Sequence, residues 1–132
     1  MIEQPDIEIY IKNADLSDVH AWLDSHFDVV PEGAISEINI ASPRTNEVEL
    51  QLAGQLVPLV ITPQAAGKAY LSVWFKSPKT PWQNDLECAQ SALERFDTEV
   101  RCSAESWAEE EPEHSEKWWK LTRTSKDLVS WG

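Results

Sequence analysis

Short segments in which apolar and polar residues alternate constrain this chain more than any other feature. In residues 7–12, IEIYIK, every second residue is isoleucine. Successive side chains of a strand point to opposite faces, so this pattern predicts a half-buried strand. The same reasoning predicts strands at 48–52, 69–76 and 100–104. The chain is therefore expected to build a sheet with one apolar face.

Three further segments predict strands with less regular patterns. Ile38 and Ile40 indicate a short strand, and residues 118–123 form the last candidate. Residues 56–62 predict a strand that contains Pro58. Because proline cannot donate to a ladder, Pro58 favours the edge of the sheet or a bulge.

Two segments with apolar residues at helical spacing predict helices. The first follows Asp15, a suitable N-cap, and is stopped by proline and glycine within residues 31–33. The second is expected to begin at Thr80-Pro81, since threonine can cap and proline suits the first turn. It should run to about Phe96. Its apolar stripe would consist of Trp82, Leu86, Ala89, Leu93 and Phe96.

The order of these elements predicts the fold class. The order β-α-β-β-β-β-α-β-β is typical of an α+β two-layer sandwich, in which two helices cover one face of a largely antiparallel sheet. The length of 132 residues is common for one domain, and no repeat or linker interrupts the pattern. We therefore expect a single α+β domain over residues 1–132. An apolar fraction of 42% excludes a disordered class.

The chain is strongly acidic, with a formal net charge of -12. Residues 1–66 hold eleven acids against only Lys12 and Arg44. A protein that binds phosphates needs a basic stripe, so this charge argues against direct binding of nucleic acid. It favours a basic protein as the partner.

The densest charge lies in residues 105–117, ESWAEEEPEHSEK, with tryptophans on both sides. Dense negative charge beside large apolar rings is typical of a surface that meets a basic partner. Pro112 and the many glutamates predict a surface loop or hairpin connection here. The candidate partner-binding residues are Trp107, Glu109, Glu110, Glu111, Glu113, Glu116, Trp118 and Trp119.

The other tryptophans divide between core and surface. Trp82 is expected in the core, whereas Trp22 and Trp74 lie where they could face solvent. Trp118 and Trp119 are adjacent in a predicted strand, so they should point to opposite faces. One of them is then expected to lie away from the core that the helices cover.

No catalytic or metal-binding motif is present. The chain has no HExxH, no CxxC and no phosphate-binding glycine loop, so no metal and no cofactor are expected. Cys88 and Cys102 fit a helix and a strand as free thiols. The absence of a signal segment and of a long apolar run favours a cytoplasmic protein that does not enter a membrane. His20 and His26, near Trp22, are the residues around which a small-molecule pocket could form.

These features favour a non-enzymatic acidic binding protein, an inhibitor or immunity-type module that engages a basic partner such as a toxin or nuclease. In size, acidity and aromatic content the chain is similar in general character to small bacterial immunity and inhibitor proteins. Two alternatives stay open. One is a small ligand-binding or enzymatic domain with its pocket near His20 and His26, and the other is a self-associating adaptor subunit.

Overall fold

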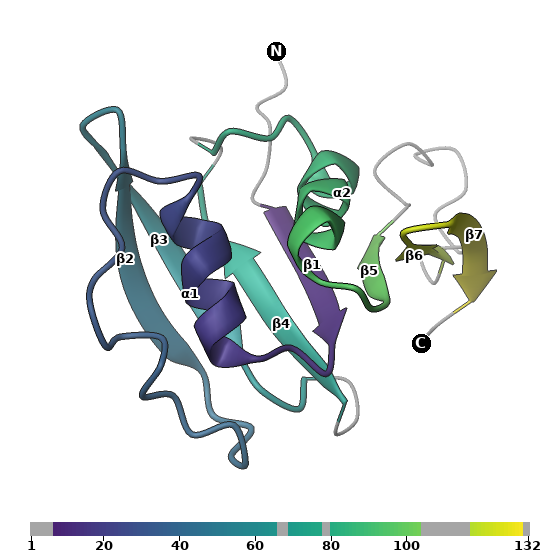
Figure 1. Cartoon of the computed structure of the whole chain (residues 1–132), viewed down its shortest axis with the longest axis horizontal. Coiled ribbons are helices and arrows are strands. Elements are labelled where there is room, and N and C mark those ends of the chain that lie inside the picture. The colour runs from purple at the N-terminus through teal and green to yellow at the C-terminus, as the bar shows by residue number, and fades with distance from the viewer. Residues whose placement is uncertain (1–6, 66–68, 78–79, 104–116, 131–132) are drawn as a thin grey trace.

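The structure is a computed structural model that describes residues 7–65, 69–77, 80–103 and 117–130. It contains a seven-stranded antiparallel sheet and two helices that pack on one face of it (Figure 1). The α+β fold predicted from the sequence is confirmed. In chain order the elements are β1 Ile7–Lys12, α1 Leu16–Asp24, β2 Asn46–Leu52, β3 Gln55–Thr62, β4 Tyr70–Phe75, α2 Asp85–Arg95, β5 Val100–Ser103, β6 Lys117–Thr122 and β7 Ser125–Ser130.

β1 lies at the centre of the sheet, whose strand order is β2-β3-β4-β1-β5-β6-β7. Ile7, Ile9 and Ile11 are fully buried toward the helices, as their alternation predicts. α1 begins at the predicted cap, because the side chain of Asp15 accepts a hydrogen bond of 2.8 Å from the amide of Ser17. The core between sheet and helices is continuous, and it includes buried side chains from β1, β2, β3, β4, β5, β6 and both helices.

Trp22 does not face solvent, as its position in the sequence had allowed, because it is only 2% exposed. Its ring stacks on that of Trp82, with centroids 5.3 Å apart, and meets Phe75 and Phe96 edge to face. The helical wheel placed Trp22 at the border of the stripe, and the bulk of the ring carries it into the core. The prediction that Trp82 is buried is confirmed, with 6% of its surface exposed.

The predicted start of α2 at Thr80-Pro81 is wrong, since the helix begins at Asp85. Asn84 is the N-cap, and its side chain accepts a hydrogen bond of 2.8 Å from the amide of Glu87. The carboxylate of Glu87 in turn accepts from the amide of Gln83. This reciprocal pattern is a variant of the capping box, and it satisfies amides that a helix start leaves unpaired. The hydroxyl of Thr80 instead bonds the backbone of Trp82 in a local turn.

The prediction of an edge or bulge for Pro58 is also wrong, because β3 lies between β2 and β4. The ladder with β4 begins one residue later, at the pair Leu59 and Phe75. The carbonyl of Pro58 accepts from the amide of Lys76 at 2.8 Å. Pro58 therefore sits at the end of β4, where the missing proline N–H breaks no regular ladder bond.

One predicted strand is absent from the described residues, and one observed strand was not predicted. The predicted strand at Ile38 and Ile40 is wrong, because that segment forms turns in which Ile38 is buried and Ile40 is 49% exposed. β7 was not predicted, although it pairs with β6 over its whole length. Its sequence, SKDLVS, lacks an apolar alternation because part of it faces solvent.

Candidate protein-binding surface

The face of the sheet opposite α1 and α2, here called the helix-free face, carries an acidic and apolar patch. Alternation turns Glu47 and Glu49 of β2 onto this face, where they lie opposite Val60 and Pro58 of β3. Trp74 of β4 pairs with Val60 on one side and with Glu8 of β1 on the other. We define the β2–β4 patch as Glu8, Glu47, Glu49, Leu56, Pro58, Val60 and Trp74.

The charges of the β2–β4 patch are mostly unneutralised. In the described part of the chain, the exposed carboxylates of Glu47 and Glu49 make no hydrogen bond and no ion pair. Glu8 accepts a hydrogen bond of 2.8 Å from Ser72. Lys76 is a cation next to the patch, and its Nζ lies 4.9 Å from the centroid of the Trp74 ring. The patch therefore pairs available negative charge with apolar surface, including Leu56 at 56% exposure.

The other half of the helix-free face holds a bonded polar network. Tyr70 donates a hydrogen bond of 2.6 Å to Glu99, which also pairs with Arg101. Burial opposes ionisation of Glu99, but the bonds from Tyr70 and Arg101 outweigh it, so the pKa of Glu99 is lowered. Burial, together with the bond to Glu99, raises the pKa of Tyr70 to about 12. These groups satisfy one another, so their charges are less available to a partner.

The two adjacent tryptophans lie on opposite faces, as predicted. Trp118 meets Tyr10 edge to face on the helix-free face, with ring centroids 5.5 Å apart. Trp119 packs against the core, and the Nζ of Lys126 lies 5.0 Å from its ring centroid. Both rings are partly buried. The other candidate residues, Trp107, Glu109, Glu110, Glu111, Glu113 and Glu116, lie outside the described residues.

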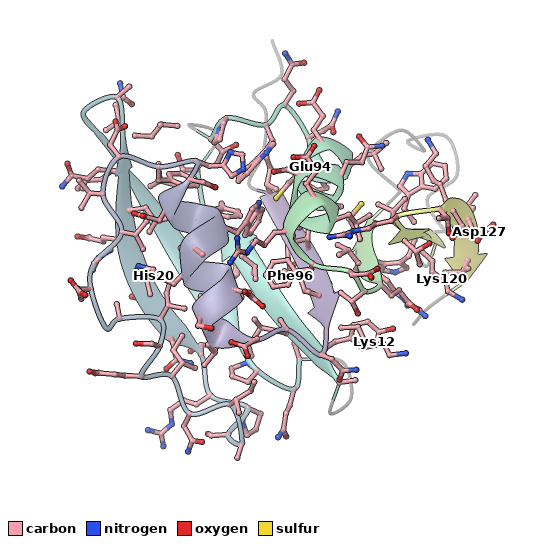
Figure 2. All side chains as sticks on the ribbon, in the orientation of Figure 1. Lys12, His20, Glu94, Phe96, Lys120 and Asp127 are labelled. Carbon is pink, nitrogen blue, oxygen red and sulfur yellow. The ribbon has the colours of Figure 1, made fainter. Side chains whose placement is uncertain are left out.

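The two histidines proposed to flank a pocket are not brought together. His20 is partly exposed on α1, on the side turned away from α2 (Figure 2). His26 faces α2, where its Nε2 lies 3.2 Å from the hydroxyl of Ser91. The same hydroxyl accepts a hydrogen bond of 3.1 Å from Trp22 Nε1. Ser91 can therefore donate its proton to His26, and the three side chains tie α1 to α2.

The His26 and Ser91 pair resembles the start of a nucleophilic dyad, but its surroundings are structural. In the described part of the chain, no carboxylate hydrogen-bonds to the His26 ring to orient it. Ser91 lies inside α2, where the backbone amides are used by the helix, so no amide is turned toward a developing oxyanion.

The remaining reactive groups do not form a metal or thiol site among the described residues. No group of three or more His, Cys, Asp or Glu side chains there is arranged to hold a metal ion. Cys88 and Cys102 are buried as free thiols in α2 and β5. Burial raises the pKa of Cys102 to about 12, and the negative charge of Asp85 adds to this effect. A buried thiol of this kind is a poor nucleophile, because the thiolate is the reactive form.

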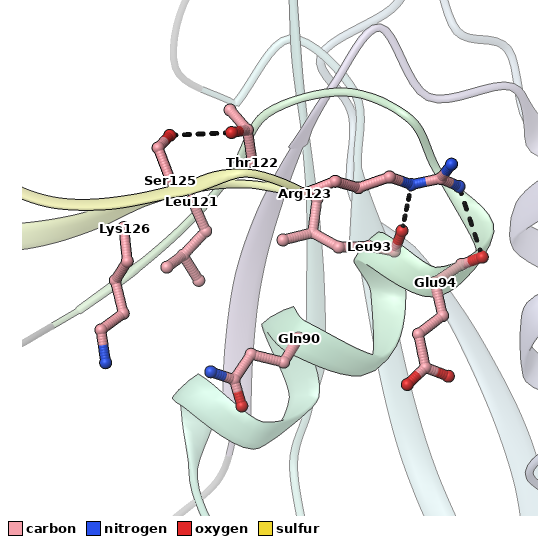
Figure 3. A pocket seen from close by; sticks show the side chains of 8 residues that line it. All are labelled: Gln90, Leu93, Glu94, Leu121, Thr122, Arg123, Ser125 and Lys126. Carbon is pink, nitrogen blue, oxygen red and sulfur yellow. Dashed lines mark hydrogen bonds between the residues drawn. The ribbon is translucent and has the colours of Figure 1, made fainter.

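A groove of about 380 Å³ lies between α2 and the hairpin of β6 and β7 (Figure 3). The guanidinium of Arg123 reaches the C-terminal end of α2 and donates to the carbonyls of Leu93, at 2.8 Å, and Glu94, at 3.4 Å. The residues that line the groove are Gln90, Leu93, Glu94, Leu121, Thr122, Arg123, Ser125 and Lys126.

Comparison with family models, with curated proteins and with solved structures found no match to this chain. Within the described residues, neither helix has the length and apolar character that crossing a membrane requires.

The β2–β4 patch was not predicted from the sequence. The alternation of Glu47 and Glu49 with Val48 and Leu50 was recognised as one strand, but a patch needs several strands in register. The sequence feature that could have located the patch is that Glu47 and Glu49 of β2 and Trp74 of β4 all alternate with the apolar residues of their strands.

Proposed function

We propose that this chain is a non-enzymatic binding protein, an inhibitor or immunity-type module that engages a basic protein partner. Its helix-free face meets the partner through the β2–β4 patch, and the acidic residues of 105–116 add charge. A basic toxin or nuclease is the kind of partner that this charge suits.

The observation that carries the proposal is the set of available carboxylates beside exposed apolar side chains in the β2–β4 patch. Glu47 and Glu49 are exposed without partners in the described part of the chain, while Pro58 and Leu56 are exposed beside them. Buried aromatic and apolar groups hold an interface together, and charged groups at its rim steer association. The patch supplies both kinds of group on one face.

The tryptophans have different expected roles in this proposal. Trp74 lies within the β2–β4 patch and Trp118 farther along the same face, so each is suited to contact a partner. Trp119 points toward the core and supports β6 from behind. Trp107 and Glu109, Glu110, Glu111, Glu113 and Glu116 remain candidates on the strength of their sequence.

Affinity capture from lysate of the host cells tests this function. The full chain is immobilised beside the double variant Glu47→Gln, Glu49→Gln and a charge-matched control, Glu32→Gln, Glu37→Gln, whose two glutamates are also exposed but lie before β2. We expect a basic protein on the wild type and on the control that is lost from the patch variant. A partner retained equally by all three, or an acidic partner, would contradict the proposed function.

The specific observation that favours the enzymatic alternative is the hydrogen bond between His26 and Ser91. That alternative predicts turnover of a small molecule that His26→Gln or Ser91→Ala abolishes while the fold is kept. Since the pair ties the segment after α1 to α2 and has no orienting carboxylate in the described residues, the binding function is better supported.

A further inference from the structure

The hairpin formed by β6 and β7 has a charge opposite to that of the whole chain. Residues 117–130 contain four basic residues, against Asp127 alone, which gives a formal charge of +3 in a chain of -12. β7 is one end of the sheet and β2, which carries Glu47 and Glu49, is the other (Figure 1). The described residues of the hairpin and of β2, at opposite ends of the sheet, therefore carry opposite charge.

Among the described residues, the outer edge of β7 offers unpaired backbone. In the described part of the chain β7 pairs with β6 alone, and Thr122 and Ser125 close the hairpin around a two-residue turn. The closing pair of such a turn is hydrogen-bonded, and bonded pairs then alternate along the ladder. Ser125, Asp127 and Val129 thus direct their amides to β6. Lys126 and Leu128 direct theirs outward.

Contacts with α2 and with the core fix the hairpin of β6 and β7 in the free protein. Arg123 at its tip donates to the carbonyls of Leu93 and Glu94 at the end of α2 (Figure 3). Leu121 anchors β6 in the core with 2% of its surface exposed. An edge held in this way loses little conformational entropy when another strand pairs with it.

The side chains beside this edge define what fits it. On the helix side of the hairpin, Leu128 lies opposite Trp119 and is 50% exposed. Lys126 lies next to it along the same face, with its Nζ above the Trp119 ring. A neighbouring strand would meet an apolar position at Leu128 and a cation at Lys126.

We propose that the outer edge of β7 is a docking site for an extended, acidic segment of another protein. The segment pairs with the outward amides of Lys126 and Leu128, places an apolar side chain on Leu128, and places a carboxylate at Lys126. Strand addition of this kind takes affinity from the backbone and specificity from alternate side chains. A second copy of this chain is disfavoured, because two hairpins that each carry +3 would repel.

This site is separate from the β2–β4 patch and does not depend on the proposed function. The test uses the full chain and fluorescence anisotropy with a labelled synthetic peptide, Thr-Val-Leu-Thr-Glu-Thr-Glu. Aligned antiparallel to β7, it sets leucine opposite Leu128 and glutamate opposite Lys126. The same peptide with lysine in place of glutamate is the control probe.

We expect saturable binding of the acidic peptide and at least about tenfold weaker binding of the lysine peptide, since like charges would then face each other. Lys126→Glu should weaken binding of the acidic peptide by a similar factor. Lys76→Glu makes the same charge change on the segment after β4 and should leave binding unchanged. Leu128→Pro removes an outward amide without removing a bond to β6. This variant should not bind the acidic peptide.

Absence of binding to the wild type, or equal binding by Lys126→Glu, would overturn the proposal, and so would equal affinity for the two peptides. Circular dichroism checks the fold of Leu128→Pro, and Lys126→Glu decides the result if that variant does not fold. A concentration-dependent dimer that Lys126→Glu abolishes would assign the edge to a second copy and would overturn the acidic occupant.

Discussion

At the scale of single residues, the aromatic cluster beneath the helices carries much of the packing. Trp82 stacks on Trp22 and lies within 6 Å of the ring centroids of His26, Phe27 and Phe75. The sequence predicted its burial correctly but assigned it to the wrong element, because Trp82 precedes α2 and reaches the core from an irregular segment. Its position depends on ring contacts with two distant segments of the chain, residues 22–27 and β4, which local periodicity does not contain.

Trp82→Ala should therefore lower the free energy of unfolding by about 3 to 5 kcal/mol, the range for emptying a large aromatic site. Urea unfolding followed by circular dichroism measures the loss. A loss below about 1 kcal/mol, which is typical of a surface site, would mean that the cluster is not packed as described.

The two tyrosines of the chain offer a test of the helix-free face. Burial raises the pKa of Tyr10 to about 12, and the negative charge of Glu8 and its hydrogen bond with Tyr10 add to this effect. Burial and Glu99 raise the pKa of Tyr70 to about 12. Each phenol thus favours the folded state below its unfolded pKa of 10.0, and this contribution is lost as the pH rises toward 12.

Absorbance at the phenolate band should show little ionisation at pH values just above 10 while the fold persists, and an unfolded sample in urea should titrate near 10. Tyr10→Phe and Tyr70→Phe separate the two residues. Ordinary titration of either phenol in the folded chain would show that its environment is open to water.

At the scale of the elements, the sequence predicted those that have a strong local pattern. β1 and α1 follow from alternation and from the cap at Asp15. The start of α2 could not be chosen locally, because Thr80-Pro81 and Asn84 with Glu87 both read as helix starts, and tertiary packing decides between them. β7 was not predicted, because a polar edge strand can be recognised only together with the strand it pairs with.

Asn84→Ala should destabilise the chain by about 1 kcal/mol, since it leaves the amide of Glu87 without its cap. Thr80→Ala is the matched control, and its smaller effect should reflect only the loss of a local turn bond to Trp82. Urea unfolding of both variants gives the comparison. A larger loss of stability for Thr80→Ala than for Asn84→Ala would mean that the helix start depends on Thr80.

At the scale of the whole molecule, the arrangement of charge could be predicted only in part. The sequence located the acidic N-terminal half, but the β2–β4 patch arises from the pairing of four strands. The basic hairpin was hidden by the net charge of -12, because the four bases and one acid of residues 117–130 are outweighed by the acids of the rest of the chain. Opposite ends of one sheet thus carry opposite charge, and this suits a protein that binds through its surfaces.

Charge at an interface acts mainly on the association rate, whereas apolar contacts act mainly on dissociation. Changing Glu109, Glu110, Glu111 and Glu113 to glutamine should therefore slow association with the captured basic partner and leave unfolding unchanged. Trp118→Ala should mainly speed dissociation. Stopped-flow binding and urea unfolding measure these effects, and a change in dissociation alone for the glutamine variant would contradict the assigned roles.

The most direct test of the central claim is the association rate of the captured partner at low and at high salt, measured for wild type, Glu47→Gln with Glu49→Gln, and the control Glu32→Gln with Glu37→Gln. If the β2–β4 patch receives a basic protein, the rate for the wild type and control should fall steeply as salt shortens the screening length to about 8 Å at physiological ionic strength. The patch variant should associate slowly at low salt and depend less on salt. Equal rates and equal salt dependence for all three proteins would contradict the claim.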